Sequence, residues 1–561
     1  VNFSKSILYS LGFSSNFFFW NSGQEYGALN GLLKPFLHTW SLSVEEQFYI
    51  LFPLILLIIY KFLKKYLIQV IILGFVISLC VADWGSRNYP SFNFYILPSR
   101  GWELLAGSIM AYFEINLGHR SENKKLNLIL PTIGLLLICH SIIYFNDKMF
   151  NPSFYTLSPI LGVCLIIWFS NKDELITKIL SSKFFVGIGL ISYSLYLWHY
   201  PIFAFDRVSE FSQESLSKKL IIGFLLFFLS ILSYYFIEQP ARKRKYKFKN
   251  IFIIIFFTIS FLIFFNSKVI LNNGFQNKLP KIISQSTPKY WKKLKNSSGE
   301  KCFQNKDGCK FNVLSDKKIF IIGDSQMATL TYNLKKKLTE KNYQFISYNY
   351  GGCFYFPDFN LVKVKTQKKS KICNNEYFSN LKEIFSQEDN SIIIIGGRLP
   401  LYLSNSFFNN QEGGIEDNEW GYEYKSTLNE ITLQNSFKKA VLELSNNNKV
   451  ILIYPIPEVG WDINQKLYNR LPKKSASKER YLKPKNYITT SYDVYKDRTK
   501  LSFELLNTIQ DENIYRVYPH KLFCNTTIKD RCLTHDNKNI FYADYSHPSS
   551  KGAEMINNEI I

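Results

Sequence analysis

The stretch "IFIIGDSQMATL", residues 319–330, decides the fold of the second half of the chain. Its apolar run ends at Gly323, Asp324 and Ser325, and a helical pattern follows. A buried strand that ends in Gly-Asp-Ser before a helix presents the serine hydroxyl on a tight turn. Two interpretations are open at this point: Ser325 is a catalytic nucleophile, or Asp324 and Ser325 are ordinary helix-capping residues.

Short β-rich runs separated by helical stretches surround this segment. The runs lie at 317–322, 343–349, 391–395, 449–454 and 513–518, and helical stretches lie near 326–340, 428–446 and 496–510. Strands that alternate with helices predict a doubly wound parallel sheet of the flavodoxin-like type, with ligands at the carboxyl ends of the strands. Ser325 lies at such an end, where its backbone N–H and that of Gly352 can serve as oxyanion donors.

A candidate base and its orienting carboxylate lie near the C-terminus. In "YADYSHPSSKGAEMI", Asp544 and His547 are three residues apart in a predicted loop before a final helix. One short segment can thus supply the base and the group that orients it, with Ser325 as the nucleophile. This combination favours the catalytic interpretation of Ser325 over the capping one.

The first half of the chain has the pattern of a polytopic membrane protein. A helix needs about 20 apolar residues to span a bilayer, and eight such segments occur at 47–63, 66–82, 101–116, 127–146, 153–170, 186–204, 219–237 and 250–271. A soluble helical bundle is the alternative. The formal net charge of +23 suggests nucleic acid binding, but many basic residues cluster between the apolar segments. We therefore expect a bilayer partner and no nucleic acid.

The loops predict an orientation for these segments. Loops rich in Lys and Arg stay cytoplasmic, and the most basic loop has six Lys and Arg residues between 242 and 249. With the loops alternating, residues 1–46 and everything after Leu271 lie outside the cytoplasm. The further basic loop at 471–485 is expected to be a solvated surface loop, with contact to an anionic glycan as the alternative.

Ionisable side chains near the ends of three predicted spans are candidates for a second site. They are His38 and Glu45, Arg100, and His199. Such groups are costly in a membrane and are usually functional. Each one alone can be a side chain that reaches the interface. Because all of them converge on the predicted outer face, we expect a polar cavity in which His acts as base and Arg holds an anionic donor.

Six cysteines of the polar half form three locally spaced pairs. The pairs are Cys302 with Cys309, Cys353 with Cys373, and Cys524 with Cys532. An even count with short loops is typical of an oxidising compartment. A zinc site is the alternative, but none of the pairs has C-x2-C spacing. We therefore predict three local disulfides and no metal.

Four motifs in the first half carry a resemblance to a known family. They read "FLHTWSLSVEEQFYILFPL", "RGWELLAGS", "ISYSLYLWHYPI" and "FIEQPARK". In this order they resemble the membrane acyltransferase-3 family over about residues 1–245. That family moves acyl groups, commonly acetyl, from cytoplasmic coenzyme A to extracytoplasmic glycans. Its pattern has further spans before this point, one of them with a catalytic His, so we expect the chain to lack the family's N-terminal spans. His38, Glu45, Arg100 and His199 match the motifs that are present.

The second half resembles the SGNH (GDSL-like) hydrolase family, in the branch fused behind acyltransferase-3 domains. The resemblance covers about residues 310–561 and rests on Gly323-Asp324-Ser325, Gly352 and Asp544-x-x-His547. At the third block the chain reads Gly396-Gly397-Arg398, where soluble members have an Asn. The side-chain oxyanion donor is therefore missing or replaced, with Arg398 as the candidate.

The resemblances together imply a multidomain protein of the bacterial inner membrane. We expect an α-helical acyltransferase-3 membrane domain of about seven spans at 1–249 and an additional transmembrane helix at 250–271. A linker at 272–310 and a periplasmic α/β SGNH domain at 311–561 would follow.

The expected activity is transfer of an acyl group, with acetyl the expected one, from acetyl-CoA to a cell-envelope polysaccharide such as lipopolysaccharide O-antigen. Ser325 would relay the acyl group. The alternatives are a membrane-tethered periplasmic carbohydrate esterase and a non-catalytic protein that binds or transports glycan.

Overall fold

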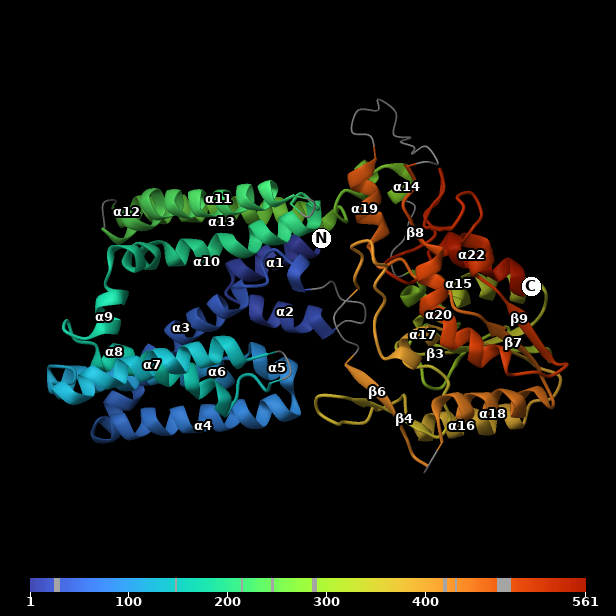
Figure 1. Ribbon diagram of the computed structural model, residues 1–561, viewed down its shortest axis with the longest axis horizontal. Coiled ribbons are helices and arrows are strands. Elements are labelled where there is room, and N and C mark those ends of the chain that lie inside the picture. The colour runs from blue at the N-terminus through green and yellow to red at the C-terminus, as the bar shows by residue number, and fades with distance from the viewer. Residues whose placement is uncertain are drawn as a thin grey trace. The chain divides into compact units, whose positions relative to one another are not determined.

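The chain folds as two compact units, Val1–Phe275 and Gln276–Ile561 (Figure 1). The computed structural model describes residues 1–24, 31–146, 149–212, 215–243, 247–284, 290–416, 421–428, 431–471 and 486–561. Residues 472–485 of the predicted basic loop lie outside the described residues. The first unit is helical and the second combines a parallel sheet with helices, which confirms the predicted fold class.

Long apolar helices make up the first unit (Figure 1). The eight predicted spans coincide with α3 (Thr39–Leu63), α4 (Leu67–Asn88), α6 (Leu97–Leu117), α7 (Lys124–Tyr144), α8 (Leu157–Phe169), α10 (Lys183–Ser209), α11 (Leu216–Ser233) and α13 (Phe248–Leu271). Between and before them lie α1 (Asn2–Leu11), α2 (Ser15–Gln24), η1 (Gly31–Leu33), η2 (Lys64–Tyr66), α5 (Pro90–Tyr95), η3 (Phe154–Thr156), α9 (Leu175–Leu180), η4 (Tyr234–Glu238) and α12 (Gln239–Arg242).

Part of this helical unit is apolar enough to cross a bilayer. Within the described residues, four helical stretches have the required length and composition: Thr39–Asn88, Lys124–Tyr144, Leu216–Arg242 and Phe248–Leu271. The first stretch contains both α3 and α4. In a membrane, lipid chains cover apolar side chains that protein atoms leave exposed. Exposed Leu, Ile and Phe side chains on these helices are therefore expected of a membrane domain. The eight-span count and the orientation stay predictions.

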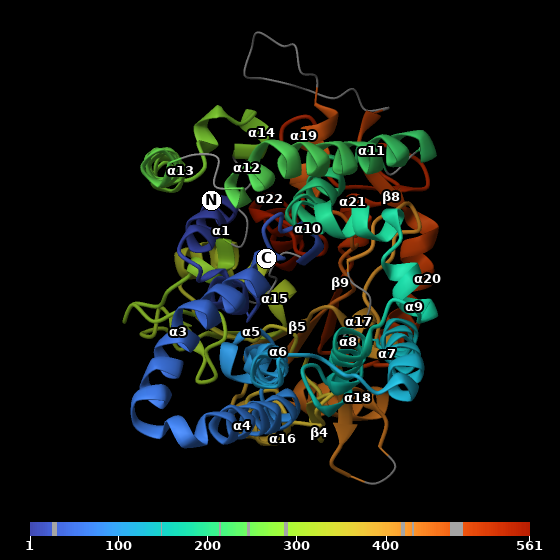
Figure 2. The same ribbon diagram turned by 90° about the vertical axis from the view of Figure 1, so that its left-hand side faces the viewer.

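Helices α7 and α8 lie side by side and cross at two glycines (Figure 2). A Cβ added to Gly134 would lie 2.6 Å from the carbonyl oxygen of Gly162. A Cβ added to Gly162 would lie 2.5 Å from the carbonyl oxygen of Gly134. Small residues allow two membrane helices to approach until their backbones touch. The packing of this pair therefore depends on both glycines.

The second unit is built on a six-stranded sheet in the order β1-β3-β2-β5-β7-β9. The five predicted strands are β2 (Lys318–Gly323), β3 (Gln344–Asn349), β5 (Ile392–Gly396), β7 (Lys449–Ile453) and β9 (Ile514–Val517). Neighbours among these five are parallel, and β1 (Cys309–Phe311) adds an antiparallel edge next to β3. This is the strand order of a flavodoxin-like sheet. Two ribbons stand apart from it, β4 (Phe359–Lys363) with β6 (Tyr422–Ser426) and β8 (Thr489–Ser491) with β10 (Arg531–Leu533).

Helices cover both faces of this sheet because its strands are apolar on both sides. In β2, Phe320 and Ile322 pack into one core cluster, and Ile319 and Ile321 into the other. The first cluster includes side chains of α16 (Asn375–Ser386), α17 (Leu399–Ser404), α18 (Leu433–Ser445) and α20 (Tyr492–Asn507). The second includes side chains of α15 (Ser325–Glu340), α19 (Ile463–Arg470), α21 (His520–Phe523) and α22 (Ser550–Ile560).

The segment expected to be a polar linker, 272–310, differs from that expectation. Unit two begins at Gln276, and the segment contains η5 (Gln276–Lys278), α14 (Lys281–Ser284) and η6 (Tyr290–Lys293). The side chains of Ile282, Ile283 and Leu294 are buried in the core of the second unit. Isolated apolar residues in a polar sequence thus anchor this segment.

The cysteines of the second unit are joined in the pairs expected from their spacing. The disulfides are Cys302–Cys309, Cys353–Cys373 and Cys524–Cys532. Cys80, Cys139 and Cys164 of the helical unit have free thiols. Each disulfide closes a local loop, which limits the conformations of the unfolded chain.

The glycine contact of α7 and α8 can be tested with one substitution at two sites. We expect Gly162→Ala to lower the melting temperature of the detergent-solubilised chain, because the new methyl group meets the Gly134 carbonyl. Gly187→Ala in α10 is the matched control, since a Cβ there has no atom within 4 Å. Alanine is favoured over glycine in helices by about 1 kcal/mol, so the control should be neutral or stabilising. Equal losses at both sites would contradict the contact.

Candidate active site

Three chain segments meet at the carboxyl ends of β2, β3 and β5. Strand register pairs Gly323 at the end of β2 with Asn349 of β3 on one side and Gly396 of β5 on the other. The residues that follow these three positions therefore emerge next to one another. They include Ser325 and the segment that leads to Gly352.

Ser325 is the first residue of α15, and it is not the cap of that helix. Asp324 is the N-cap, and its carboxylate accepts a hydrogen bond from Gln326 N–H at 2.8 Å. The Ser325 hydroxyl instead lies 2.7 Å from Nε2 of His547. Asp324 is therefore the helix-capping residue, and Ser325 is the residue whose hydroxyl faces the histidine.

Ser325, His547 and Asp544 form a continuous hydrogen-bonded chain. Nδ1 of His547 lies 2.8 and 2.9 Å from the two carboxylate oxygens of Asp544. Because a carboxylate only accepts, Nδ1 carries the proton, and the neutral ring keeps its lone pair on Nε2. Nε2 can therefore accept the proton of the Ser325 hydroxyl. This is the geometry of a serine nucleophile, a general base and an orienting carboxylate.

Asp544 is held ionised by the loop that contains it. Burial alone would raise its pKa, but the His547 ring, the His547 N–H and the Ser546 N–H outweigh burial and lower the pKa to about 2. The two backbone N–H groups donate to Oδ1 at 2.9 and 3.1 Å. A carboxylate that stays ionised stabilises the imidazolium formed when His547 takes a proton.

Asp324 joins the serine helix to the segment that follows β5. Its Oδ2 accepts hydrogen bonds from Arg398 N–H and from the Tyr402 hydroxyl, both at 2.7 Å. Burial raises the pKa of Asp324, although these donors act against the shift. Gly397 has a φ of +141°, and a Cβ there would lie 2.9 Å from the Asp324 carboxyl carbon. A residue without a side chain is therefore required beside this carboxylate.

Arg398 was the candidate for the missing oxyanion donor, and its guanidinium is engaged elsewhere. It donates to Glu458 Oε1 at 2.5 Å and to Glu416 Oε1 at 2.9 Å. Burial acts to lower the pKa of Arg398, but the two glutamates raise it well above its usual value. With its guanidinium bound to two carboxylates, Arg398 contributes to the site through its backbone N–H.

The ion pairs of Arg398 also reach the loop of His547. Glu458 accepts a hydrogen bond from Arg498 Nε at 3.2 Å, and the two arginines lower its pKa despite its burial. The next two residues, Val459 and Gly460, donate their N–H groups to the carbonyl oxygen of Tyr545 at 2.8 and 2.9 Å. Arg398 and Glu458 thus connect Asp324, which caps the helix of Ser325, with the loop that contains His547.

Gly352 follows β3 in a turn that Cys353 N–H closes on the Tyr350 carbonyl at 3.1 Å. Its φ of +72° is in the left-handed region, and a Cβ there would have no atom within 4 Å. The space beside it is open, as access to a substrate requires. Its role as an oxyanion donor stays a prediction.

In the helical unit, His38 and His199 are brought together. Their ring centroids lie 5.5 Å apart, and the His38 ring stacks on Tyr200 at 5.4 Å. His199 Nδ1 lies 2.7 Å from the Tyr196 carbonyl oxygen, which only accepts, so the neutral ring has its lone pair on Nε2. Both nitrogens of His38 are buried and have no hydrogen-bond partner among the described residues.

Arg100 and Glu45 are the two charged residues predicted for this site. Arg100 forms an ion pair with Glu103 at 2.9 Å, and its guanidinium lies 5.2 Å from the centre of the Trp40 ring. Glu45 is exposed on α3, and it makes no hydrogen bond or ion pair within the described parts of the chain. The structure thus brings the two histidines together. Glu45 lies near Glu103, the partner of Arg100, and near Tyr196, whose ring centroid is 5.1 Å from that of His38.

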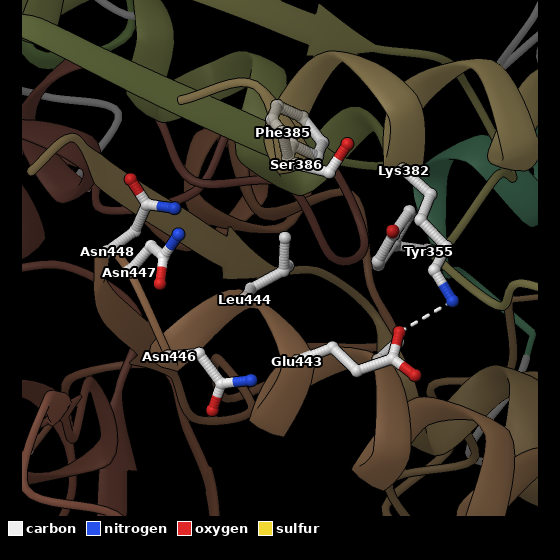
Figure 3. Close-up of a pocket in the computed structure, with 10 residues that line it drawn as sticks. Tyr355, Lys382, Phe385, Ser386, Glu443, Leu444, Asn446, Asn447 and Asn448 are labelled. Atoms are coloured by element: carbon white, nitrogen blue, oxygen red, sulfur yellow. Dashed lines mark ion pairs between the residues drawn. The ribbon is translucent and has the colours of Figure 1, made fainter. Parts of the chain in front are cut away.

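A separate pocket of about 220 Å³ opens between α16 and α18 (Figure 3). An ion pair between Lys382 and Glu443 of 2.6 Å lies on its wall. Asn447 and Asn448, also on the wall, hydrogen bond to Asp389 and to Ser391 N–H. The pocket contains no residue of the Ser325 site, and its polar groups support the local fold.

Sequence reasoning missed two parts of the site. One is the pairing of Arg398 with Glu416, Glu458 and Arg498, which come from separate segments with no spacing signal. The other is Trp291, which stacks on His547. The adjacent Tyr290 and Trp291 in an otherwise polar segment were the only available signal for it.

Both halves of the chain match known families. Residues 6–208 match the family described as "Acyltransferase domain", and residues 292–561 match the family described as "SGNH domain (fused to AT3 domains)". The chain combines an acyltransferase-3 domain with an SGNH domain. The resemblances carried by the sequence motifs are thereby confirmed for both halves.

Two curated relatives are named as O-acetyltransferases. The chain is 30% identical to the peptidoglycan O-acetyltransferase OatA of Listeria monocytogenes over 273 residues, which cover 45% of this chain and 43% of that protein. It is 32% identical to the O-acetyltransferase OatA of Staphylococcus aureus over 231 residues, which cover 38% of this chain and 37% of that protein. The chain thus spans less than half the length of these relatives.

A solved structure also matches. It is the periplasmic domain of a lipopolysaccharide acetyltransferase from Salmonella ser. Paratyphi A, at 18% identity and a TM-score of 0.28. The match covers 43% of this chain and 81% of that one.

The buried network of Arg398 predicts a large loss of stability. We expect Arg398→Met to destabilise the chain by about 3 kcal/mol, because it removes the cation paired with Glu416 and leaves the buried Glu458 with Arg498 alone. Lys551→Met removes one partner of the exposed Lys551–Glu554 pair and should cost less than about 1 kcal/mol. Thermal unfolding of the full chain in detergent compares the two. Similar losses would contradict a structural role for the network.

Asp544 predicts a defined dependence of stability on pH. Its folded pKa of about 2 lies below the ordinary value of 3.8, so its contribution is fully present above pH 3.8 and disappears as pH falls through 2. A shift of this size corresponds to about 2 kcal/mol. We expect the difference in melting temperature between wild type and Asp544→Asn to persist down to about pH 4 and to shrink below it. Ser325→Ala keeps the Asp544–His547 pair and should follow wild type. A gap that closes already at pH 5 would refute the assignment.

Proposed function

We propose that this chain is a membrane O-acyltransferase that moves an acyl group, acetyl in the first instance, onto a polysaccharide of the cell envelope. The observation that carries the proposal is the hydrogen-bonded Ser325–His547–Asp544 chain in a protein that also has an acyltransferase-3 domain. The names of the OatA relatives support the reaction and the acetyl group.

The first half-reaction makes an acyl-enzyme on Ser325. As Oγ attacks the carbonyl carbon of the acyl donor, its proton passes to Nε2 of His547, 2.7 Å away. Asp544 stabilises the resulting imidazolium through Nδ1. The backbone N–H groups of Ser325 and Gly352 would bind the oxyanion. The donor's leaving group then takes the proton from Nε2, and the acyl ester remains on Oγ.

The second half-reaction transfers the acyl group to a sugar. A sugar hydroxyl attacks the ester carbonyl and gives its proton to Nε2 of His547. The Oγ–acyl bond breaks, and the Ser325 oxygen recovers the proton from Nε2. The product is an O-acylated glycan, and the free serine is restored.

The helical unit would supply the acyl group from acetyl-CoA, which is a substrate here. Buried His38 supports this role, because its ring nitrogens have no hydrogen bond of ordinary geometry among the described residues, as expected where a bound group completes the site. His199, with its lone pair on Nε2 and its ring 5.5 Å from that of His38, would act as a base beside it. Arg100, paired with Glu103, would support the cavity rather than hold the donor.

The proposed location is the inner membrane of a bacterium, with the SGNH domain in the periplasm. Apolar helices support the membrane location, and three disulfides in the second unit support an oxidising compartment. Lipopolysaccharide O-antigen is the acceptor we propose within such an envelope. Peptidoglycan, named for the Listeria relative, is the acceptor that the experiment must distinguish from it.

A carbohydrate esterase is the second candidate, because the same triad can activate water. Hydrolysis would remove acyl groups from the glycan instead of adding them. The two functions differ in the sign of the effect when Ser325 is removed, which makes them separable in one experiment.

The test follows labelled acetyl from acetyl-CoA onto glycan in vesicles that contain the full chain. Purified lipopolysaccharide and peptidoglycan serve as separate acceptors. We expect label on lipopolysaccharide with wild type and none with Ser325→Ala, since loss of a triad nucleophile costs about a millionfold in rate. Ser386→Ala, in the pocket of Figure 3, is the serine control and should behave as wild type.

His199→Ala locates the step performed by the helical unit. It should abolish transfer from acetyl-CoA but retain hydrolysis of a soluble aryl acetate, which needs only the Ser325 site. Normal transfer by Ser325→Ala would refute the proposal. Increased glycan acetylation in that variant would establish the esterase, and label only on peptidoglycan would overturn the proposed acceptor.

A further inference from the structure

A short aromatic segment outside the SGNH motifs closes over the catalytic histidine. Tyr290 and Trp291 lie in η6, between the last long helix of the first unit and the sheet of the second. Only 4% of Tyr290 and 1% of Trp291 is exposed, although the surrounding sequence is polar. Such burial of two large aromatic rings in a connecting segment calls for a role.

The indole of Trp291 stacks on the imidazole of His547. The ring centroids lie 5.0 Å apart and the planes are inclined by 25°. Trp291 and Tyr290 form a buried cluster with Ala328 of α15 and Ala543, which precedes Asp544. The indole thus packs in the cluster where the serine helix and the Asp544–His547 loop meet.

Several bonds fix this segment relative to the triad. The Tyr290 hydroxyl donates to the Thr329 carbonyl on α15 at 2.9 Å. Cys302 N–H donates to the Leu294 carbonyl at 3.0 Å, and Cys302 is joined by its disulfide to Cys309 of β1. Gln304 N–H donates to the carbonyl of Asn349, at the end of β3, at 3.0 Å. The chain on either side of Trp291 is therefore bonded to the sheet and to the serine helix.

Stacking and packing, not a hydrogen bond, hold the indole itself. Its Nε1–H is buried and has no hydrogen-bond partner among the described residues. The interaction with His547 therefore depends on the aromatic face. A phenyl ring offers a similar face, and an aliphatic side chain does not.

We infer that Trp291 is a positioning residue for His547, and that its aromatic face stabilises the imidazolium that forms in both half-reactions. The inference rests on the proposed function, in which His547 becomes positively charged twice per turnover. An aromatic face attracts a cation by about 0.5–2 kcal/mol, more strongly where water is excluded. The neutral ring gains less from the same contact, so the indole favours the protonated state reached near each transition state.

Hydrolysis of a soluble aryl acetate by the full chain in detergent tests this role without any assumption about the glycan. We expect Trp291→Leu to lower kcat about tenfold and to leave KM within twofold, because the indole contacts the base and not the substrate. Trp291→Phe should restore kcat to within about threefold of wild type. The ratio of acyl transfer to hydrolysis with a competing alcohol should stay unchanged, since the same imidazolium serves both acceptors.

Tyr290→Phe is the matched structural control. It removes the hydrogen bond from the same short helix to Thr329 but leaves the stack on His547. It should lower the melting temperature and keep kcat within twofold of wild type. If Tyr290→Phe lowers kcat as much as Trp291→Leu, or if Phe at 291 gives no rescue, the segment acts only through the fold and the inference is wrong.

Two further outcomes separate this inference from the proposed function. If Ser325→Ala abolishes ester hydrolysis while Trp291→Leu leaves kcat intact, the triad stands and only the role of Trp291 fails. If Ser325→Ala hydrolyses the ester normally, the proposed function itself fails. A changed ratio of transfer to hydrolysis in Trp291→Leu would show that the indole excludes water, which overturns imidazolium stabilisation as its role.

Discussion

The buried carboxylate of Asp324 is the interaction on which the rest of the active site depends. Asp324 directly follows β2, caps the helix that begins with Ser325, and accepts hydrogen bonds from Arg398 N–H and the Tyr402 hydroxyl of the neighbouring segment. A group that accepts three hydrogen bonds from two chain segments fixes their relative position, and an unpartnered carboxylate in the same place would be strongly unfavourable. A side chain at Gly397 would meet this carboxylate, and one at Gly323 would meet the Gly396 carbonyl oxygen, because the two segments approach to within the reach of a single methyl group.

The histidine loop is held against this fixed point by contacts of different kinds. Gln326, the residue after the serine, donates its side-chain N–H to the carbonyl of Ser546 at 3.0 Å. The N–H groups of the loop after Glu458 donate to the carbonyl oxygen of Tyr545. Glu458 itself is paired with the Arg398 guanidinium, and the Arg398 N–H donates to Asp324. Trp291 adds an aromatic contact on the face of the ring. Nucleophile and base come from positions more than 200 residues apart, so these contacts replace the constraint that chain connectivity cannot provide.

Local patterns predicted most of the fold. Alternation of short β-branched runs with helical stretches gave all five parallel strands. The strands β2, β3, β5 and β7 lie inside the sheet and are largely buried on both faces, whereas β9 at the edge is buried only at Ile514 and Val517. The edge strand β1 and the two ribbons were missed, since strands of this kind are short and partly polar. The triad was visible because Asp544 and His547 lie in one loop. The partners of Arg398 and the stack of Trp291 were not, because contacts between distant segments leave no spacing in the sequence. In the helical unit the motifs singled out His38 and His199, whose ring centroids lie 5.5 Å apart, but could not tell that Arg100 would pair with Glu103, three residues away on the same helix.

A triad of this geometry does not by itself choose between water and a sugar hydroxyl. His547 removes a proton equally well from either nucleophile, so the outcome depends on which one occupies the space beside the acyl-enzyme. In the proposed function, joining the membrane domain and the serine domain in one chain would make delivery of the acyl group an intramolecular event with a high effective concentration. This would raise the rate at which Ser325 is acylated but leave the competition in the second half-reaction unchanged. The acceptor must therefore be favoured over water by its own binding beside the acyl-enzyme.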